Sequence, residues 1–224
     1  MENKSSKSKT KRRLFATLFS IVLCMLLIGV SVYAATSQSA KITNSITISS
    51  SQQTRTDVVV SWVNGPATEE RLLYATSTAL PAEGYTEAVN KPYNEDNKTG
   101  TGPDIQFSYS NMYTYVVYKM EFNNRSTDKD STITININNQ DETPTAYEFN
   151  EQISIYFGKE GALSEASFIA DSGYSLTGSV AKQTQEVYYL VVALNKDIAD
   201  VSAVSIENYD ILINVACLLY TSPS

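Results

Sequence analysis

Apolar and polar residues alternate with a period of two over most of the chain that follows Lys41. Ile42, Ile46 and Ile48 fall on one side of the first such segment, and threonine and serine residues fall on the other. This spacing is typical of a β-strand with one buried and one hydrated face. No long segment shows the 3.6-residue period of an amphipathic helix. The alternation therefore predicts a protein built almost wholly from strands.

Further strands are predicted wherever the alternation recurs. They lie at residues 57–63, 105–109, 112–122, 131–138, 147–157, 187–194, 201–206 and 209–215. Residues 187–194 are apolar on both faces, which indicates a central strand covered on both sides. Residues 123–126 (NNRS) predict a hairpin turn between the strands on either side of them, and Asn64-Gly65-Pro66 predicts a turn that ends an earlier strand.

The remaining segments are expected to be connections. Residues 81–104 are rich in Pro, Gly and Asn and predict the longest surface loop, while residues 67–76 and 160–170 could each form a helical turn or two. Short strands separated by polar turns indicate an all-β fold, an antiparallel two-sheet sandwich of jelly-roll or Ig-like type. Residues 35–216 are expected to form this single β-sandwich domain.

The N-terminal segment has the features of an export signal. Residues 1–13 hold six Lys or Arg residues, and the 19 residues 14–32 form an apolar run that predicts a hydrophobic signal helix. Small residues before the junction of Ala34 and Ala35 predict cleavage there. The alternative is that residues 1–34 stay as a membrane anchor, because the run is nearly as long as a bilayer span. Either outcome predicts a secreted or cell-surface protein that touches the membrane only through its leader.

Charge is distributed unevenly between the leader and the rest of the chain. Residues 35–224 keep eleven basic and 23 acidic side chains, a net charge of −12, although the whole chain carries only −7. A body of this charge repels the phosphates of nucleic acid, so no nucleic-acid partner is expected.

Cysteine and histidine are scarce. The chain has no histidine and two cysteines, Cys24 inside the leader and Cys217 near the end, so neither a disulfide framework nor a zinc site is expected. Residues 217–224 (CLLYTSPS) resemble translated read-through of a sequencing adapter, and the domain is therefore expected to end at residue 216 with an artefactual tail after it.

Catalytic chemistry has little support in the sequence. Without histidine a Ser-His-Asp triad cannot exist, and the adjacent carboxylates at 69–70 and 141–142 are expected to be solvated turn residues. No catalytic residue, cofactor or metal ligand is assigned, and the protein is not expected to be an enzyme. A calcium site is not excluded by the sequence, because oxygen ligands occur together at Asn94, Glu95, Asp96 and Asp104, and again at Asp128 and Asp130. Neither group has the EF-hand spacing, and Asn and Asp are also typical of turns.

Two other candidate sites use residues on predicted strands. Tyr113 and Tyr115 fall on the less apolar side of their strand, beside charged residues, and form a candidate ligand face for stacking on a cell-wall glycan. Packing alone also favours tyrosine in strands. Lys41, Asn214 and an acid such as Glu121 provide the residue types for an intramolecular Lys–Asn crosslink between the first and last strands.

Several segments together carry a resemblance to secreted proteins of Firmicutes. They are the basic leader that ends in GVSVYAAT, the small-residue segment KITNSITISS, and the motif K-x-E-F-N-N-x-S, within cysteine-free sandwich strands. The chain is most similar to the TasA and camelysin type, which implies a jelly-roll fibre or surface protein. It departs from that type where TSQSAKITNS replaces the A-G-T-L-D-L-like first strand, and the protease activity of camelysins is not implied here, because no histidine or metal-ligand motif is present.

The sequence therefore suggests an exported structural protein of the cell surface or extracellular matrix, such as a fibre or biofilm subunit or an adhesin. The alternative is a carbohydrate- or ligand-binding module. Self-association is expected through the N-terminal strand, because residues 35–50 could pair with the open sheet edge of a neighbouring copy. The simpler interpretation is that these residues form the first strand of their own sheet.

Overall fold

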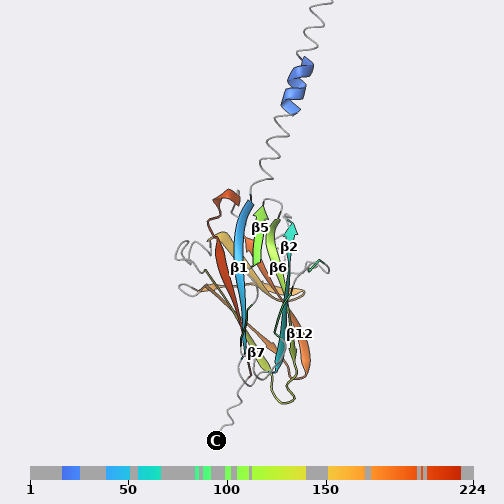
Figure 1. Ribbon diagram of the computed structural model, residues 1–224, viewed down its shortest axis with the longest axis vertical. Coiled ribbons are helices and arrows are strands. Elements are labelled where there is room, and N and C mark those ends of the chain that lie inside the picture. Colours follow the sequence, from blue (N-terminus) through green and yellow to red (C-terminus); the bar gives the residue numbers. More distant parts are fainter. Residues whose placement is uncertain are drawn as a thin grey trace, which may run out of the picture. The chain divides into compact units, whose positions relative to one another are not determined.

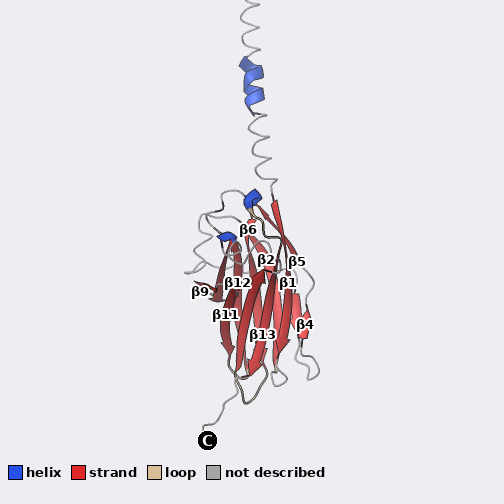
Figure 2. Cartoon of the chain, turned by 90° about the vertical axis from the view of Figure 1, so that its left-hand side faces the viewer, coloured by secondary structure: helices blue, strands red, loops and turns tan. Residues whose placement is uncertain are grey.

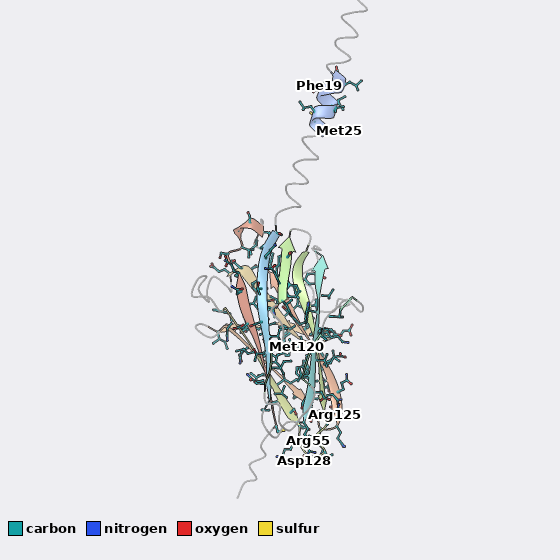
Figure 3. All side chains as sticks on the ribbon, viewed as in Figure 1. Phe19, Met25, Arg55, Met120, Arg125 and Asp128 are labelled. Carbon is teal, nitrogen blue, oxygen red and sulfur yellow. The ribbon has the colours of Figure 1, made fainter. Side chains whose placement is uncertain are left out.

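The computed structural model describes residues 17–25, 39–50, 55–66, 84–85, 88–91, 99–101, 105–110, 113–139, 151–169, 173–195, 198 and 201–217. The chain divides into two compact units, Met1–Gln38 and Ser39–Ser224. In the first unit, residues 17–25 form a helix whose apolar side chains, Phe19 and Met25 among them, are exposed (Figure 3). No helix within the described residues has the length and apolar character needed to cross a membrane.

The second unit consists of two β-sheets, as predicted (Figure 1). Sheet A has the order β10-β11-β7-β13-β1-β4, and β5 also pairs with β1. Its strands are β1 (Ser39–Ser50), β4 (Thr99–Thr101), β5 (Ile105–Ser110), β7 (Ser131–Asn139), β10 (Phe168–Ile169), β11 (Gly173–Val180) and β13 (Asn208–Cys217). Sheet B has the order β3-β2-β6-β12-β8-β9. Its strands are β2 (Thr56–Pro66), β3 (Ala88–Lys91), β6 (Tyr113–Asn124), β8 (Ile153–Lys159), β9 (Ala162–Glu165) and β12 (Thr184–Leu194).

Sheet A contains one parallel pair, formed by the first and last strands of the domain. Residues 43–50 of β1 pair in register with residues 208–215 of β13, while β4 and β5 pair antiparallel with the other side of β1. Figure 2 shows β11, β13, β1 and β4 in this order across the sheet. Because β1 and β13 run in the same direction, β1 begins at one end of the sandwich, here the entry end, and β13 finishes at the other, the exit end.

The main core lies between the two sheets. Alternate residues of β1, β7 and β13 on one side, and of β6 and β12 on the other, are almost fully buried in one apolar cluster. Met120 is among them and lies within the sandwich (Figure 3). The strand at residues 187–194 was predicted to be central, and β12 occupies that position between β6 and β8. Both of its faces are buried from Leu190 to Leu194.

The outer face of sheet B carries a second, smaller apolar cluster. Its buried members are Tyr115, Val117, Tyr156, Leu163, Val191 and Ala193, and Val63, Tyr85 and Tyr189 pack against them. Apart from Tyr85, which lies between β2 and β3, these residues occupy strand positions that point away from the main core. Sheet B is therefore apolar on both faces over part of its area, which accounts for the absence of clear alternation in β12.

The predicted hairpin between residues 112–122 and 131–138 is wrong. β6 belongs to sheet B, where it pairs with β2 and β12, and β7 belongs to sheet A, where it pairs with β11 and β13. Residues 125–130 instead carry the chain from one sheet to the other at the exit end. Alternation predicts both strands equally well in either arrangement, because it reports which residues face inward and not which strand lies alongside.

The side chain of Asn124 supports this crossing between the sheets. It is fully buried, and its Nδ2 donates hydrogen bonds to the carbonyl oxygens of Lys129 (3.0 Å) and Val180 (3.2 Å). The backbone amide of Ser126 donates to Asn124 Oδ1 (3.0 Å). One buried amide group thus joins the end of β6, the connection that follows it and the end of β11.

Four other expectations about local structure are also wrong. β2 continues through Asn64-Gly65-Pro66 with a register shift instead of turning there. The described part of 160–170 contains β9 and β10 instead of a helical turn, and Gly161 adopts a φ of 73° that allows a tight hairpin between β8 and β9. Residues 201–206 begin with the 3₁₀ helix η2 (Val201–Ala203) instead of a strand. The expected loop at 81–104 contains the short strands β3 and β4.

Three fully buried tyrosines lie in the core near the entry end. The hydroxyl groups of Tyr118 in sheet B and Tyr209 in sheet A are 2.7 Å apart and share a hydrogen bond. Burial raises the pKa of Tyr118, Tyr209 and Tyr109 well above the usual value of a tyrosine. These phenols are therefore neutral wherever the protein is folded.

Replacing Asn124 by alanine is expected to lower the free energy of unfolding by about 2 to 4 kcal/mol, because it removes three hydrogen bonds and leaves their buried partners unsatisfied. Asn123→Ala, one residue earlier and on the opposite face of β6, is the matched control and is expected to have little effect. Urea denaturation of the two variants measures the difference. Equal stability of both variants would show that the amide does not support the crossing.

Alkali is expected to unfold the domain in a steep transition. The unfolded chain loses tyrosine protons near pH 10, whereas Tyr109, Tyr118 and Tyr209 keep theirs while folded, so stability falls as the pH rises above that value. Each of the three contributes a slope of up to about 1.4 kcal/mol per pH unit. Phenolate absorbance and circular dichroism, followed together, should show these tyrosines ionising only as the strands are lost. Ionisation of all 15 tyrosines with the strands intact would contradict the expectation.

Candidate functional site

Among the residues proposed for leader cleavage and for ligand binding, the structure describes the side chain of Tyr115 alone. Ala34 and Ala35 lie outside the described residues, as does the side chain of Tyr113. Tyr115 was expected to face water, and this is wrong: it is 3 % exposed and belongs to the apolar cluster on the outer face of sheet B. A tyrosine held in this way has no free ring face for a sugar. The glycan-binding face thus has no support from Tyr115.

The calcium ligands suggested at the exit end have protein partners instead. Asp128 accepts a hydrogen bond from Ser126 Oγ (2.9 Å), which lowers its pKa, and Asp130 accepts one from the backbone amide of Lys182 (2.8 Å). Figure 3 shows Asp128 near Arg55 and Arg125. Among the residues that the structure describes, no three acidic or cysteine side chains are grouped to hold a metal ion. The other suggested ligands, residues 94–96 and 104, lie outside them, as do the carboxylates at 69–70 and 141–142.

One spacing associated with catalysis was missed in the sequence. Ser126 and Lys129 stand in the order S-x-x-K, the arrangement of a lysine-activated serine nucleophile, as do Ser179 and Lys182. The first pair lies in the connection between the sheets. The serine is 3 % exposed, and its hydroxyl donates to Asp128 while accepting the backbone amide of Lys129 (3.2 Å). These bonds stabilise the connection between the sheets. Ser126 is therefore a turn residue in this structure and not an accessible nucleophile.

The crosslink suggested for Lys41 and Asn214 does not fit the strand register. β1 and β13 are neighbours, but Asn214 lies opposite Ser49, which is eight residues beyond Lys41. That separation is about 26 Å along an extended strand. Glu121 belongs to the other sheet. The three residues are not brought together, and this hypothesis is wrong.

Strand β1 is the feature of the domain that is most suited to a function in assembly. It lies between β13 on one side and β4 and β5 on the other, so both of its backbone edges are paired. Ile42, Ile46 and Ile48 project into the main core and are at most 1 % exposed. Burial of each such side chain stabilises by about 1.5 to 3 kcal/mol. Within the described residues, Ser39–Ser50 therefore form an interior strand of their own sheet, in agreement with the simpler of the two interpretations.

Polar contacts on the outer face of sheet A fasten β1 further. The hydroxyl of Ser45 donates to the carboxylate of Asp210, and that of Ser49 donates to the amide oxygen of Asn214. The backbone amide of Thr43 donates to the carbonyl oxygen of Glu207 (2.8 Å). These contacts all join β1 to β13 or to the residue before it. The parallel pair is thus held by side chains on both of its faces.

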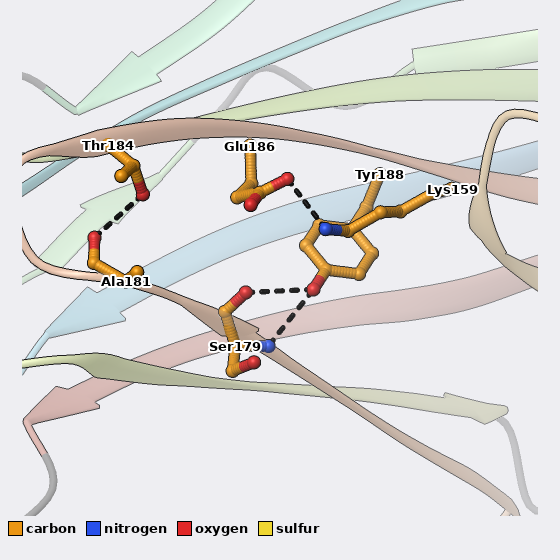
Figure 4. Close-up of polar contacts among 6 residues, drawn as sticks. All are labelled: Lys159, Ser179, Ala181, Thr184, Glu186 and Tyr188. Carbon is orange, nitrogen blue, oxygen red and sulfur yellow. Dashed lines mark hydrogen bonds and ion pairs between the residues drawn. The ribbon is translucent and has the colours of Figure 1, made fainter.

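At the β11 side of sheet A, a side chain from sheet B protects the strand edge from pairing with another chain. β10 covers only residues 173 and 174 of β11, so the outward backbone groups farther along β11 lie at a sheet edge. Tyr188 of sheet B reaches this edge (Figure 4). Its hydroxyl accepts a hydrogen bond from the amide of Ser179 (3.0 Å) and donates one to the carbonyl oxygen of the same residue (2.8 Å). One phenol therefore occupies both backbone groups that a neighbouring strand would bind.

Neighbouring residues hold Tyr188 in place. Its ring stacks on Phe157 with the centroids 5.3 Å apart, and Lys159 Nζ lies 5.6 Å from the ring centroid. Lys159 is itself paired with Glu186 at 2.7 Å (Figure 4). A Cβ atom at Gly178 would lie 3.0 Å from the ring, so glycine leaves the room that the ring needs. None of these contacts is visible in the sequence, because the apolar run at residues 187–194 predicts a buried strand without indicating what the hydroxyl of Tyr188 contacts.

Comparison with known proteins identifies no relative of this chain. No protein-family model matches the chain, and a search of curated proteins finds no similar sequence. The function must therefore be argued from β1, from the sheet edges and from the sequence features outside the sandwich.

Replacing Tyr188 by phenylalanine is expected to open the edge of β11. The ring and its stacking remain, but Ser179 loses both of its outward hydrogen bonds, so its amide should exchange with solvent about ten-fold faster and the domain should lose about 1 to 2 kcal/mol. Hydrogen exchange followed by NMR measures this directly. Tyr189→Phe, on the opposite face of the same strand, is the control and should leave Ser179 protected. An unchanged exchange rate in Tyr188→Phe would exclude the protective role.

Proposed function

We propose that this protein is an exported structural protein of the bacterial cell surface or extracellular matrix, whose copies assemble by exchanging the N-terminal strand β1. The observation that carries the proposal is the position of this strand. β1 is the first strand of the domain, yet it lies in the interior of sheet A between β13 and β4 with β5.

Such a strand can be supplied by another copy without any change in the fold. β1 belongs to sheet A, the next strand β2 belongs to sheet B, and only the segment between residues 50 and 56 joins them directly. When β1 leaves, β13 and β5 lose a neighbour, and the space filled by Ile42, Ile46 and Ile48 opens. The equivalent strand of a second copy restores both, and this is how elements are exchanged between protomers at low cost.

Features outside the sandwich support a role outside the cell. The leader holds the basic residues and apolar run of an export signal, and the body is strongly acidic, which favours solubility over unspecific adhesion. The absence of histidine from the sequence removes the commonest catalytic base. A structural or adhesive role requires only a stable sandwich and a means of association. The carbohydrate- or ligand-binding alternative uses either the Tyr113 and Tyr115 face or the loop at residues 81–104. The burial of Tyr115 does not favour the first of these two sites.

A disulfide between β1 and β13 distinguishes exchange from a closed monomer. Thr47 and Leu212 are register partners on the outer face of sheet A, so the pair Thr47→Cys and Leu212→Cys can form a disulfide across the parallel strands. The variant begins at Ala35 and also carries Cys217→Ser. Oxidation before assembly is expected to hold β1 in its own domain and to abolish concentration-dependent filaments. Oxidation after assembly should give covalent multimers on a non-reducing gel.

The matched control places a disulfide elsewhere in the same sheet. Leu212 is also a register partner of Asn136 on β7, so Leu212→Cys with Asn136→Cys joins two strands that stay in the same copy when β1 is exchanged. This variant should still form filaments and should never give covalent multimers. Deletion of residues 35–50 should abolish filaments in the parent chain. The proposal fails if the parent chain stays monomeric at all concentrations, or if oxidised filaments of the first variant contain only monomers.

A further inference from the structure

The outer face of sheet A is almost free of charge. The outward positions of β1, β7 and β11 are serine, threonine or asparagine throughout residues 43–49, 132–138 and 175–179. Those of β13 are Asn208, Asp210, Leu212, Asn214 and Ala216. Asp210 is the only charged side chain among these described positions, and Lys41 lies beyond them at the entry end. The chain from residue 35 onward holds 23 acidic and eleven basic side chains, so this neutral face belongs to a strongly acidic body.

The centre of this face carries an apolar side chain. Leu212 is the only large apolar residue among the positions named above, and it is half-buried. Its register partners are Asn136 on β7 and Thr47 on β1, and the next outward residues along β13 are Asp210 and Asn214. An apolar side chain surrounded by hydrogen-bonding groups is the arrangement of a protein–protein interface, with an apolar centre and a polar rim.

The size of the face fits contact with another protein domain. The strands β11, β7, β13, β1 and β4 lie side by side in it (Figure 2). With strands about 4.8 Å apart and outward positions that extend about 27 Å along β13, the face covers about 650 Å² before the relief of its side chains is counted. Each partner in a standard interface buries about 800 Å². The exposure of Ser175, Thr177 and Asn214 shows that the face is open to solvent.

The charge of the body favours a second copy of this chain as the partner. Two acidic copies repel each other where their charged surfaces meet, whereas a nearly neutral face lets them approach within the screening length of about 8 Å. The described positions of the face include no aromatic side chain on which a sugar ring could stack. Copies of the chain are therefore a better match for this face than a glycan.

Asp210 restricts how two such faces can meet. Identical faces pack about a two-fold axis that lies between them. An axis along β13 would place the Asp210 carboxylates of the two copies opposite each other, where like charges repel. An axis across the strands at the level of Leu212 instead places Asp210 opposite Asn214 of the second copy, and the Nδ2 of an asparagine can donate to a carboxylate. The strands of the two sheets then stay nearly aligned, as in other face-to-face packing of sheets.

We propose that the outer face of sheet A is a docking surface for the same face of a second copy, with Leu212 at its centre and Asp210 opposite Asn214 of that copy. The contact leaves β1 in its own domain and does not depend on strand exchange. It gives the protein a second surface through which copies associate. Its area and polar composition are those of a weak, reversible interface.

The test uses a chain that begins at Ala35 and in which β1 cannot be exchanged. Thr43 on β1 and Gln106 on β5 are register partners, so Thr43→Cys with Gln106→Cys, combined with Cys217→Ser, can form a disulfide that holds β1 in its own domain. Sedimentation equilibrium of this oxidised chain, the locked parent, should show reversible dimers. A locked parent that stays monomeric up to millimolar concentration would overturn the docking surface and leave the face to a different partner. Loss of filaments from the unlocked chain would concern strand exchange alone.

Two lysine substitutions in the locked parent test the geometry. Leu212→Lys places like charges at the centre and should raise the dissociation constant of the dimer at least about ten-fold. Asn214→Lys places a cation opposite Asp210 of the second copy and should lower the dissociation constant about three-fold or more, an effect that added salt should reduce. Asn214 and Asp210 of one copy are about 13 Å apart along β13, so this gain does not come from an ion pair within a copy.

Val187→Lys is the matched control. Val187 is also a half-buried aliphatic residue of a strand, but it lies on the outer face of sheet B. This substitution changes the net charge by the same amount and should leave the dissociation constant unchanged. Equal effects of all three lysines would show that net charge alone governs association and would overturn the proposal. Asn214 is exposed, so Asn214→Lys and the control decide the matter even if Leu212→Lys does not fold.

Discussion

The parallel pairing of β1 with β13 is the contact on which sheet A depends. β4 and β5 reach the rest of the sheet only through β1, and β7 and β11 reach it only through β13. The two strands stand at opposite ends of the domain sequence, so this contact closes the longest loop in the fold and is made against the largest entropy of closure. Apolar burial on one face and Ser45 and Ser49 on the other make up for that cost. The same arrangement makes β1 necessary for the sheet, because its removal would separate β4 and β5 from the other strands.

Two buried asparagines show how the surroundings decide what a polar group does inside the sandwich. Asn124 is fully buried at the exit end and finds carbonyl and amide partners in the backbone that crosses between the sheets. Asn44 is buried at the level of a regular strand, where the backbone groups of its neighbours are already engaged in the sheet. Chain crossings leave backbone groups free to bond, whereas strand interiors do not. An amide in the second setting needs another side chain or a water.

Two strands of sheet A, β1 and β11, are kept from pairing with other chains by different means. β1 would be a long apolar edge strand, but β13 and two short strands, β4 and β5, enclose it. β11 keeps an edge, and the hydroxyl of Tyr188 binds both outward groups of Ser179 there. An exposed edge invites uncontrolled pairing with other chains. The phenol of Tyr188 therefore removes one site at which a second chain could pair with sheet A.

The sequence by itself determined which residues face inward in most strands, because a period of two is a local property of each strand. The core positions of β1, β5, β6, β7, β8 and β13 were readable from alternation, and the continuous apolar run of β12 indicated a strand buried on both faces. It did not determine which strands are neighbours. The crossing after Asn124, the short strands β3 and β4, and the burial of Tyr115 were missed, because each depends on residues distant in the chain. Strands β9, β10 and β11 were also missed, although β9 and β10 pair with segments close to them in sequence. Of the candidate site, the sequence indicated β1 as a strand, but only the tertiary structure placed it between β13 and β5. The physical reason is that side-chain alternation is set by the backbone within one segment, whereas strand order is set by packing among all of them.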